Sequence, residues 1–488
     1  MSPAEQIRSR GGSNPAFRRA TVALAAIFLT GCASLSVDGD TDALQRLIAG
    51  KTGGVDVRLV DPGVDQPARD AAVAALLERP LEAESAVRVA LLNNPALQGS
   101  MATLGVSDAQ RVEAGRLPNP HFMLGRFRAA DTLEIERLLT FNVVGMLALP
   151  WQARWQGQQH ELAKLQAAQD VVKLAADTRK AWINAVAAQQ IAAYMADAKE
   201  AAEASGELAR RMARVGNWSR LRQAQEQVFL ADVTAQMARA QQVAFSKREE
   251  LIRLMGLWGS QTRFTLAQRL PDLPREARAM SDIESTALRE RLDVRSAVAE
   301  SAYVADQLGL KKVLGYVDGM TLAYGRNTTF DNAAQTRETR RGWELELPLP
   351  IFDGGSARNA RSRSMYMQSV ARVGEVAVRA RSEAREAYHG YRTAYDLARH
   401  YRNEIVPLRK FINDELVLRY SGMLASVWDL LADTRMQIAN INSAIEAQRD
   451  FWLAETDLQT ALTGTSPGAM TAARGRSGDA GGAAAPAH

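Results

Sequence analysis

Thiols are almost absent from this sequence. Its 488 residues include one cysteine, Cys32. A single cysteine cannot form a disulfide within the chain, and it excludes a metal site built on several thiolates. The five histidines lack the spacing of metal ligands, since they lie far apart at positions 121, 160, 389, 400 and 488. We therefore expect neither a metal nor another cofactor.

Aromatic residues and net charge are also scarce. Only 6 % of the residues are aromatic, whereas 47 % are hydrophobic and alanine supplies much of that share. This composition favours long, closely packed helices over a large globular core. The net charge is +5, of which four arginines and one glutamate in residues 1–31 contribute about +3, so we expect no nucleic-acid partner. No nucleophile motif, phosphate-binding glycine loop or metal-ligand cluster is present, and we expect no enzyme.

The N-terminus has the pattern of a secretory signal. Two arginines precede residues 20–29, an apolar run that is too short to span a bilayer. A charged start, a short apolar run and small residues at the end predict a signal peptide over residues 1–31. Residues 29–32 (Leu-Thr-Gly-Cys) resemble the bacterial lipobox, which implies a lipid such as palmitate on Cys32 and an anchor in the outer membrane. The alternative is an ordinary signal with a chance cysteine.

Glycine and proline divide the rest of the chain into a repeated order of elements. Residues 33 to about 80 look loop-like. Helical patterns, two strand-like segments and a long helical stretch broken at Gly216 then follow, over residues 80–92, 96–114, 121–128, 134–149 and 151–256. The same order returns, with strands near 315–324 and 342–349, a polar loop between them, and a long helix from residue 351 that Pro407 should kink and that breaks at 419–422.

Matching motifs identify this order as an internal duplication. Residues 90–97 match 287–294, and Leu149-Pro150 matches Leu349-Pro350, at an offset that grows only from about 197 to about 208. The predicted domains are a signal peptide, a lipid-anchored linker, a first repeat, an inter-repeat linker, a second repeat and a disordered tail, over residues 1–31, 32–80, 81–260, 261–282, 283–464 and 465–488. Neither half can bury its long helices or pair its strand edges alone, so we expect an oligomer.

These motifs together resemble the bacterial outer-membrane efflux proteins, the TolC-like exit ducts of tripartite pumps and type I secretion systems. The resemblance covers about residues 80 to 465, and its motifs lie at 29–32, 93–97, 114–120, 347–355 and 419–429. It implies a mainly α-helical homotrimer with a long α-helical barrel in the periplasm and a twelve-stranded outer-membrane β-barrel, four strands per chain. It also implies a periplasmic adaptor, an inner-membrane transporter and outer-membrane lipid as partners.

The resemblance assigns roles to the two predicted helix tips. Adaptor docking is expected at Arg214, Gly216, Arg419, Tyr420, Ser421 and Gly422. The plainer interpretation is a pair of hairpins that need glycine for a positive φ. Asp429 is expected to form a ring of three carboxylates at a constriction, and Arg222 could pair with it to close the entrance. The plainer alternative for Asp429 is a solvated carboxylate on a helix surface.

A membrane-tethered structural coiled coil remains the alternative function. It explains the long helices and the lipid anchor, but it does not explain two strand pairs or duplicated tips. The presence of a β-sheet would separate the passive exit duct from the coiled coil.

Overall fold

The computed structural model describes residues 41–52, 66–314, 320–347 and 355–468. The signal peptide, Cys32, most of the 347–355 motif and most of the tail lie outside these residues. The chain forms two compact units. The first is described in Leu104–Glu161 and Ser301–Gln368, and the second takes in the other described residues. Each unit therefore draws on both sequence repeats. None of the described helices combines the length and the apolar character that a membrane span requires.

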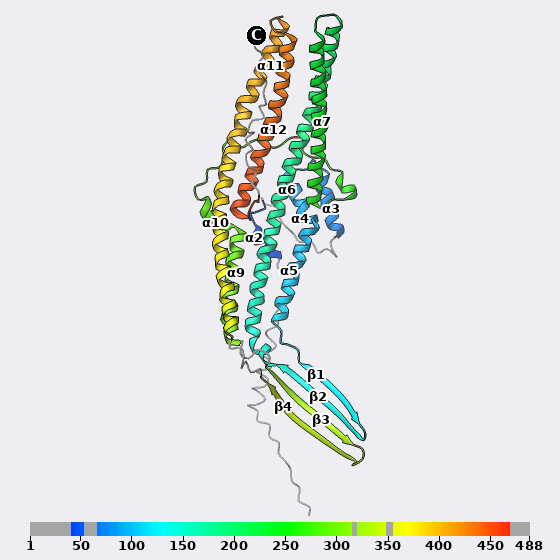
Figure 1. The fold of residues 1–488 in the computed structure, drawn as a ribbon, viewed down its shortest axis with the longest axis vertical. Coiled ribbons are helices and arrows are strands. Elements are labelled where there is room, and N and C mark those ends of the chain that lie inside the picture. The colour runs from blue at the N-terminus through cyan, green and yellow to red at the C-terminus, as the bar shows by residue number, and fades with distance from the viewer. Residues whose placement is uncertain (1–40, 53–65, 315–319, 348–354, 469–488) are drawn as a thin grey trace, which may run out of the picture. The chain divides into compact units, whose positions relative to one another are not determined.

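The elements follow the predicted order twice (Figure 1). The first set is α4 (Ala83–Asn93), α5 (Pro95–Ala114), β1 (His121–Ala129), β2 (Thr132–Asn142), α6 (Val143–Arg214) and α7 (Arg220–Met255). The second set is α8 (Ile283–Glu290), α9 (Leu292–Leu314), β3 (Thr321–Asp331), β4 (Thr336–Glu346), α10 (Ser356–His400), the π-helix η2 (Tyr401–Ile405), α11 (Val406–Ser421) and α12 (Val427–Thr463). A short 3₁₀ helix, η1 (Gly259–Thr262), begins the linker between the two sets.

Three sequence predictions of secondary structure are wrong. The loop-like region before residue 80 contains α2 (Thr41–Ile48) and α3 (Gln66–Leu77). The second strand ends well before Leu149, because the Asn142 side chain accepts the Gly145 N–H at 2.8 Å and starts α6, which leaves Pro150 inside that helix. The polar loop expected between the last two strands is mostly strand, and only a short turn separates β3 from β4.

The disturbance predicted at Pro407 is confirmed as a π-helical turn. Val406 donates its N–H to the carbonyl of Tyr401, five residues back, and η2 occupies the interval. Proline has no N–H to continue the ordinary α-helical pattern, so the helix widens by one residue and restarts with Pro407 in the first turn of α11.

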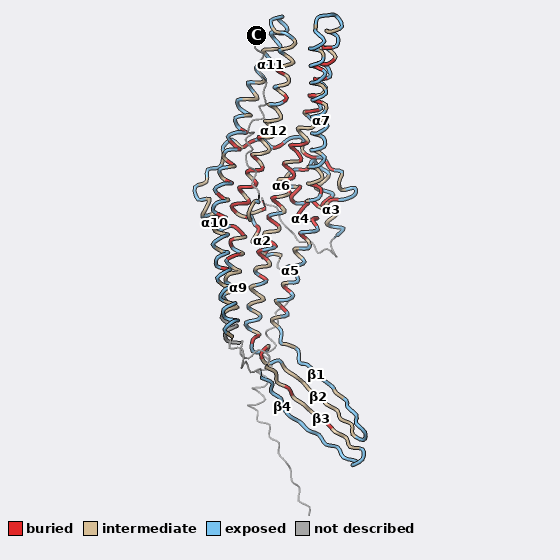
Figure 2. The backbone as a smooth tube through the Cα atoms, viewed as in Figure 1, coloured by how far each residue is buried: buried red, intermediate tan, exposed pale blue. Residues whose placement is uncertain are grey.

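The first unit holds one antiparallel sheet in the order β1-β2-β3-β4 (Figure 1). The central pairing of β2 with β3 joins the strands of the two repeats, with Thr132 opposite Asp331 and Asn142 opposite Thr321. The outer strands β1 and β4 are almost entirely exposed, while β2 and β3 are half-buried (Figure 2). Both edges of the sheet are thus open within the described part of the chain.

In the second unit, residues of the inter-repeat linker take part in two of the hydrophobic clusters. The first cluster packs α4, α6 and α7 against linker residues such as Leu266 and Leu270. The second packs alanines of α10 against Phe451 of α12, and Leu273 of the linker joins it. The Tyr395 hydroxyl donates to the carbonyl of Arg275 at 2.7 Å, which fixes the linker to α10.

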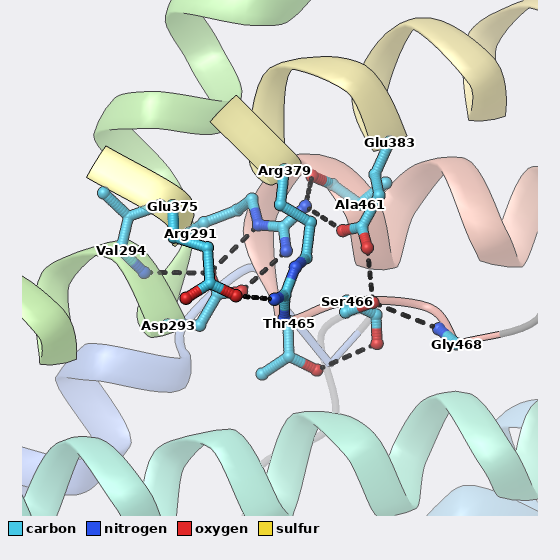
Figure 3. A network of polar contacts seen from close by, with 10 residues as sticks. All are labelled: Arg291, Asp293, Val294, Glu375, Arg379, Glu383, Ala461, Thr465, Ser466 and Gly468. Carbon is cyan, nitrogen blue, oxygen red and sulfur yellow. Dashed lines mark hydrogen bonds and ion pairs between the residues drawn. The ribbon is translucent and has the colours of Figure 1, made fainter. Parts of the chain in front are cut away.

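The two repeats anchor their first helix junctions in corresponding ways. Asn94, between α4 and α5, donates its amide to the carbonyl of Leu254 at the end of α7, at 2.8 Å. The matching residue is Arg291, between α8 and α9, whose side chain is fully buried. It binds Asp293 through two nitrogens at 3.0 and 2.6 Å and Glu383 of α10 at 2.8 Å, and it also donates to Ala461 near the end of α12 (Figure 3). The duplicated motif therefore connects each short helix pair to the last helix of its repeat, which is α7 in the first repeat and α12 in the second.

Candidate functional site

The first tip joins α6 to α7 through residues 215–219. Arg214 ends α6, and Gly216 has a φ of +77°, the left-handed conformation that a glycine adopts without strain. The N–H groups of Asn217 and Trp218 both bond to the carbonyl of Met212, which satisfies the end of α6. The predicted need for glycine at this hairpin is confirmed at Gly216.

The turn at the second tip has a different backbone conformation. Gly422 has a φ of −82°, and the left-handed residue is Met423, with a φ of +61°. The prediction that Gly422 serves a positive φ is therefore wrong. Leu424 donates its N–H to the carbonyl of Arg419 at 2.8 Å, so the turn closes one residue later than the glycine suggests.

Apolar side chains cover the second tip. Met423 is 94 % exposed and Leu424 is 82 % exposed, beside a half-exposed Tyr420. Arg419 pairs with Glu415 of its own helix at 3.0 Å, and the Ser421 hydroxyl bonds to the carbonyl of Val417. In the sequence the glycine at position 422 indicates the turn, and no local pattern marks Met423 and Leu424 as its exposed residues.

The predicted gate residues occupy corresponding places in the two return helices. Ser219 caps α7 and accepts the N–H of Arg222, while Ser426 caps α12 and accepts the N–H of Asp429. Both gate residues are thus the third residue of their helix. A carboxylate is favoured there by the helix dipole and an arginine is not. The position of Arg222 in α7 is therefore electrostatically unfavourable for a cation.

The contacts of the two gate residues differ. Asp429 forms a reciprocal capping box, because its carboxylate accepts the backbone N–H of Ser426 at 2.9 Å and the Ser426 hydroxyl at 2.7 Å. These hydrogen bonds from Ser426 lower the pKa of Asp429. The guanidinium of Arg222 lies 5.8 Å from the ring centre of Trp428. In the described residues no ion pair joins Arg222 to Asp429, and their shared role in a gate stays a prediction.

A cluster that the sequence did not indicate links the two hairpins near their tips. Glu226 of α7 is fully buried, and it pairs with Arg435 of α12 at 2.6 Å. Its second oxygen accepts the Ser205 hydroxyl of α6 at 2.7 Å. The rings of Trp218 and Trp428 meet edge to face, with centroids 6.4 Å apart. We call Ser205, Glu226 and Arg435, with Trp218 and Trp428, the hairpin latch.

Comparisons with known proteins identify solved structures that have the same architecture. No family model and no curated protein matches the sequence. Among solved structures, the outer membrane protein VceC of Vibrio cholerae is similar over 81 % of this chain and 97 % of its own, with a TM-score of 0.60 and 16 % identity. The CmeC outer membrane channel of Campylobacter jejuni is similar over 86 % of this chain and 92 % of its own, with a TM-score of 0.62 and 14 % identity.

A third similar structure is the open state of the MtrE outer membrane channel of Neisseria gonorrhoeae. It matches over 78 % of this chain and 89 % of its own, with a TM-score of 0.62 and 14 % identity. Each of these matches spans most of both chains. This chain therefore has the fold of these outer-membrane proteins, which is the TolC-like fold that its sequence resembles.

Proposed function

We propose that this protein is the outer-membrane exit duct of a tripartite efflux or type I secretion system. The observation that carries the proposal is the sheet, which takes one strand pair from each repeat and is open at β1 and at β4. The long helical hairpins and the shared fold support the same conclusion. A structural coiled coil alone, the alternative function, needs no such sheet.

The two open sheet edges support assembly of this chain with further copies of itself. An exposed edge strand offers unpaired N–H and C=O groups to another chain. Three copies joined edge to edge supply twelve strands, and the sheet can then close on itself. Four apolar side chains of α11 are also exposed, and we assign them to contact with a neighbouring copy: Leu408, Phe411, Ile412 and Leu418.

The proposed mechanism involves no chemistry by this chain. An inner-membrane transporter supplies the energy, and the trimer supplies a water-filled path. A periplasmic adaptor docks on the tips, where the exposed Met423 and Leu424 offer apolar contact beside Arg419. Lipid on Cys32 holds the protein to the outer membrane. Replacing Cys32 by serine should abolish incorporation of a labelled lipid into the protein and leave its helical content unchanged.

Asp429 and Arg222 are proposed to control the entrance. Three copies place three carboxylates of Asp429 in one ring, which attracts cations and repels anions. Asp429→Asn should therefore lower the cation preference of single channels, and Arg222→Gln should raise it. Equal permeability ratios in both variants and the wild type would remove these residues from the gate.

The primary test is the assembly state and conductance of the full-length protein. Light scattering should give a protein mass about three times that of one mature chain, which is the 53.2 kDa chain without its signal peptide. Planar bilayers should then show discrete channel openings from the same fraction. A monomer without conductance would contradict the exit duct and favour the tethered coiled coil.

A further inference from the structure

The strand register separates charge of opposite sign onto the two faces of the sheet. Side chains alternate between faces along each strand, and directly paired residues share a face. One face, the arginine face, carries six arginines and no acidic residue: Arg126, Arg128, Arg137, Arg326, Arg337 and Arg341. The opposite face, the glutamate face, carries five glutamates and one arginine: Glu134, Glu136, Glu338, Glu344, Glu346 and Arg340.

Side-chain contacts agree with this division. On the glutamate face, Arg340 pairs with Glu338 at 3.0 Å, and Asn327 donates to Glu134. On the arginine face, the guanidinium of Arg337 lies 5.2 Å from the ring centre of Phe330. Among the described residues, none of the six arginines of the arginine face forms an ion pair.

Three of these arginines stand abreast on neighbouring strands. Arg137 is paired with Arg326, and Arg326 is paired with Arg341. Like charges directly opposite one another destabilise a sheet. The Nε atom of Arg326 is also buried and has no hydrogen-bond partner. An anion lying between these guanidinium groups would offset their repulsion and accept their hydrogen bonds.

The rest of the arginine face indicates what carries that anion. The next row toward the helical ends of the strands is Phe122, Leu139, Tyr324 and Trp343, and beyond it lie Phe141, Leu322 and Leu345. Tyr324 and Trp343 pack with ring centroids 5.0 Å apart. Rows on one face are about 7 Å apart, since two residues separate them. Charged rows and apolar rows thus lie side by side, as the head and tail of an amphiphile require.

We propose that the arginine face binds the phosphate groups of an anionic membrane lipid, whose acyl chains lie along the aromatic rows of the same face. Arginine suits this role because its planar guanidinium binds phosphate through two parallel hydrogen bonds. The inference rests on the proposed function, because it needs the sheet to stand in the outer membrane with the arginine face toward lipid. The glutamate face then lines the water-filled path.

The test compares neighbouring arginines that lie on opposite faces. The triple variant removes the three charges of the central row: Arg137→Gln, Arg326→Gln and Arg341→Gln. The matched control is Arg340→Gln, on the glutamate face of β4. Delipidated full-length protein is titrated with lipid A, a glycolipid with two phosphates, and binding is followed by native mass spectrometry. Dephosphorylated lipid A and inorganic phosphate are titrated in parallel.

We expect the wild type and Arg340→Gln to bind lipid A equally, within about twofold. The triple variant should bind about 100-fold more weakly, because each arginine near a lipid surface contributes about fivefold. A second triple variant, with lysine at the same positions, keeps the charge but loses the paired hydrogen bonds, and it should recover only part of the affinity. Inorganic phosphate alone and the dephosphorylated lipid should bind weakly to every form.

Three results would overturn the inference. Equal lipid A affinity in the wild type and in both triple variants would show that the arginine row is not the site. Equal affinity for the dephosphorylated lipid would show that phosphate is not recognised. An altered anion-to-cation permeability in the glutamine triple variant, with unchanged lipid binding, would place the arginine face in the channel. The conductance of the wild type is measured in parallel. A wild type without conductance would contradict the proposed function, whereas a conducting wild type with any of the three results above would contradict this inference alone.

Discussion

The hairpin latch makes a quantitative prediction for the variant Arg435→Ala. This change leaves the carboxylate of Glu226 fully buried, with only the Ser205 hydroxyl as a partner. Removing one member of a buried ion pair destabilises a protein by about 3–5 kcal/mol. The side chain of Arg435 is 32 % exposed, so water can replace part of the interaction. We therefore expect the lower end of this range, about 3 kcal/mol, in the contact between the two hairpins.

Hydrogen exchange measures this loss locally. A change of about 3 kcal/mol lowers protection by about 100-fold, and the loss should appear in α7 near Phe229 and in the first turns of α12. The double variant Glu226→Gln with Arg435→Met removes both charges and should restore protection to within about tenfold of the wild type.

Arg409→Ala is the control for the latch, because Arg409 pairs with Asp433 at 3.5 Å within the second hairpin only. Its loss of protection should be confined to α11 and α12. Unchanged exchange in α7 after Arg435→Ala would refute the latch. An equal loss in the single and double variants would show that the buried charge is not the cause.

Three further predictions concern the backbone and pH. Gly216→Ala should destabilise the protein by about 1–2 kcal/mol, because alanine is strained at a positive φ, whereas Gly422→Ala should have little effect in the same denaturant titration. Burial raises the pKa of Glu455, more than Arg278 lowers it; the ionised form therefore costs stability above the unfolded pKa of about 4.3. Glu455→Gln should raise the melting temperature at neutral pH, and this gain should vanish as the pH falls to about 4. The pKa of Asp429 is lowered, so its capping contribution is present above the unfolded pKa of about 3.9 and is lost as the pH falls through the folded value. Asp429→Asn should remove this acid-induced fraying of α12, measured by exchange at low pH.

Local signals in the sequence were sufficient for much of the helical architecture. Gly216 and Gly256 both have a positive φ, at +77° and +65°, and helices end beside them as the sequence predicts. The helix start predicted after Pro150 was wrong, because the side chain of Asn142 caps α6 and the helix begins there.

Long-range features could not be predicted in the same way. Glu226 and Arg435 are 209 residues apart, and nothing near either residue indicates its partner. The arginine face depends on strand register, and a shift of one residue would exchange the two faces. The predicted strand bounds in the second repeat were too short to give that register, so the segregation of charge was visible only in the structure.

The two tips are alike in their serine caps but unlike in their turns, since one is built on Gly216 and the other on Met423. A three-fold assembly of this chain would therefore present six hairpin ends of two alternating kinds. A partner ring of six identical subunits would have to bind two unequal sites with one surface, and half of its contacts would differ from the other half. A ring of three subunits, each spanning both kinds of tip, would meet no such conflict. In such an assembly, the stoichiometry of any adaptor that binds the tips would depend on the difference between the two turns of this chain.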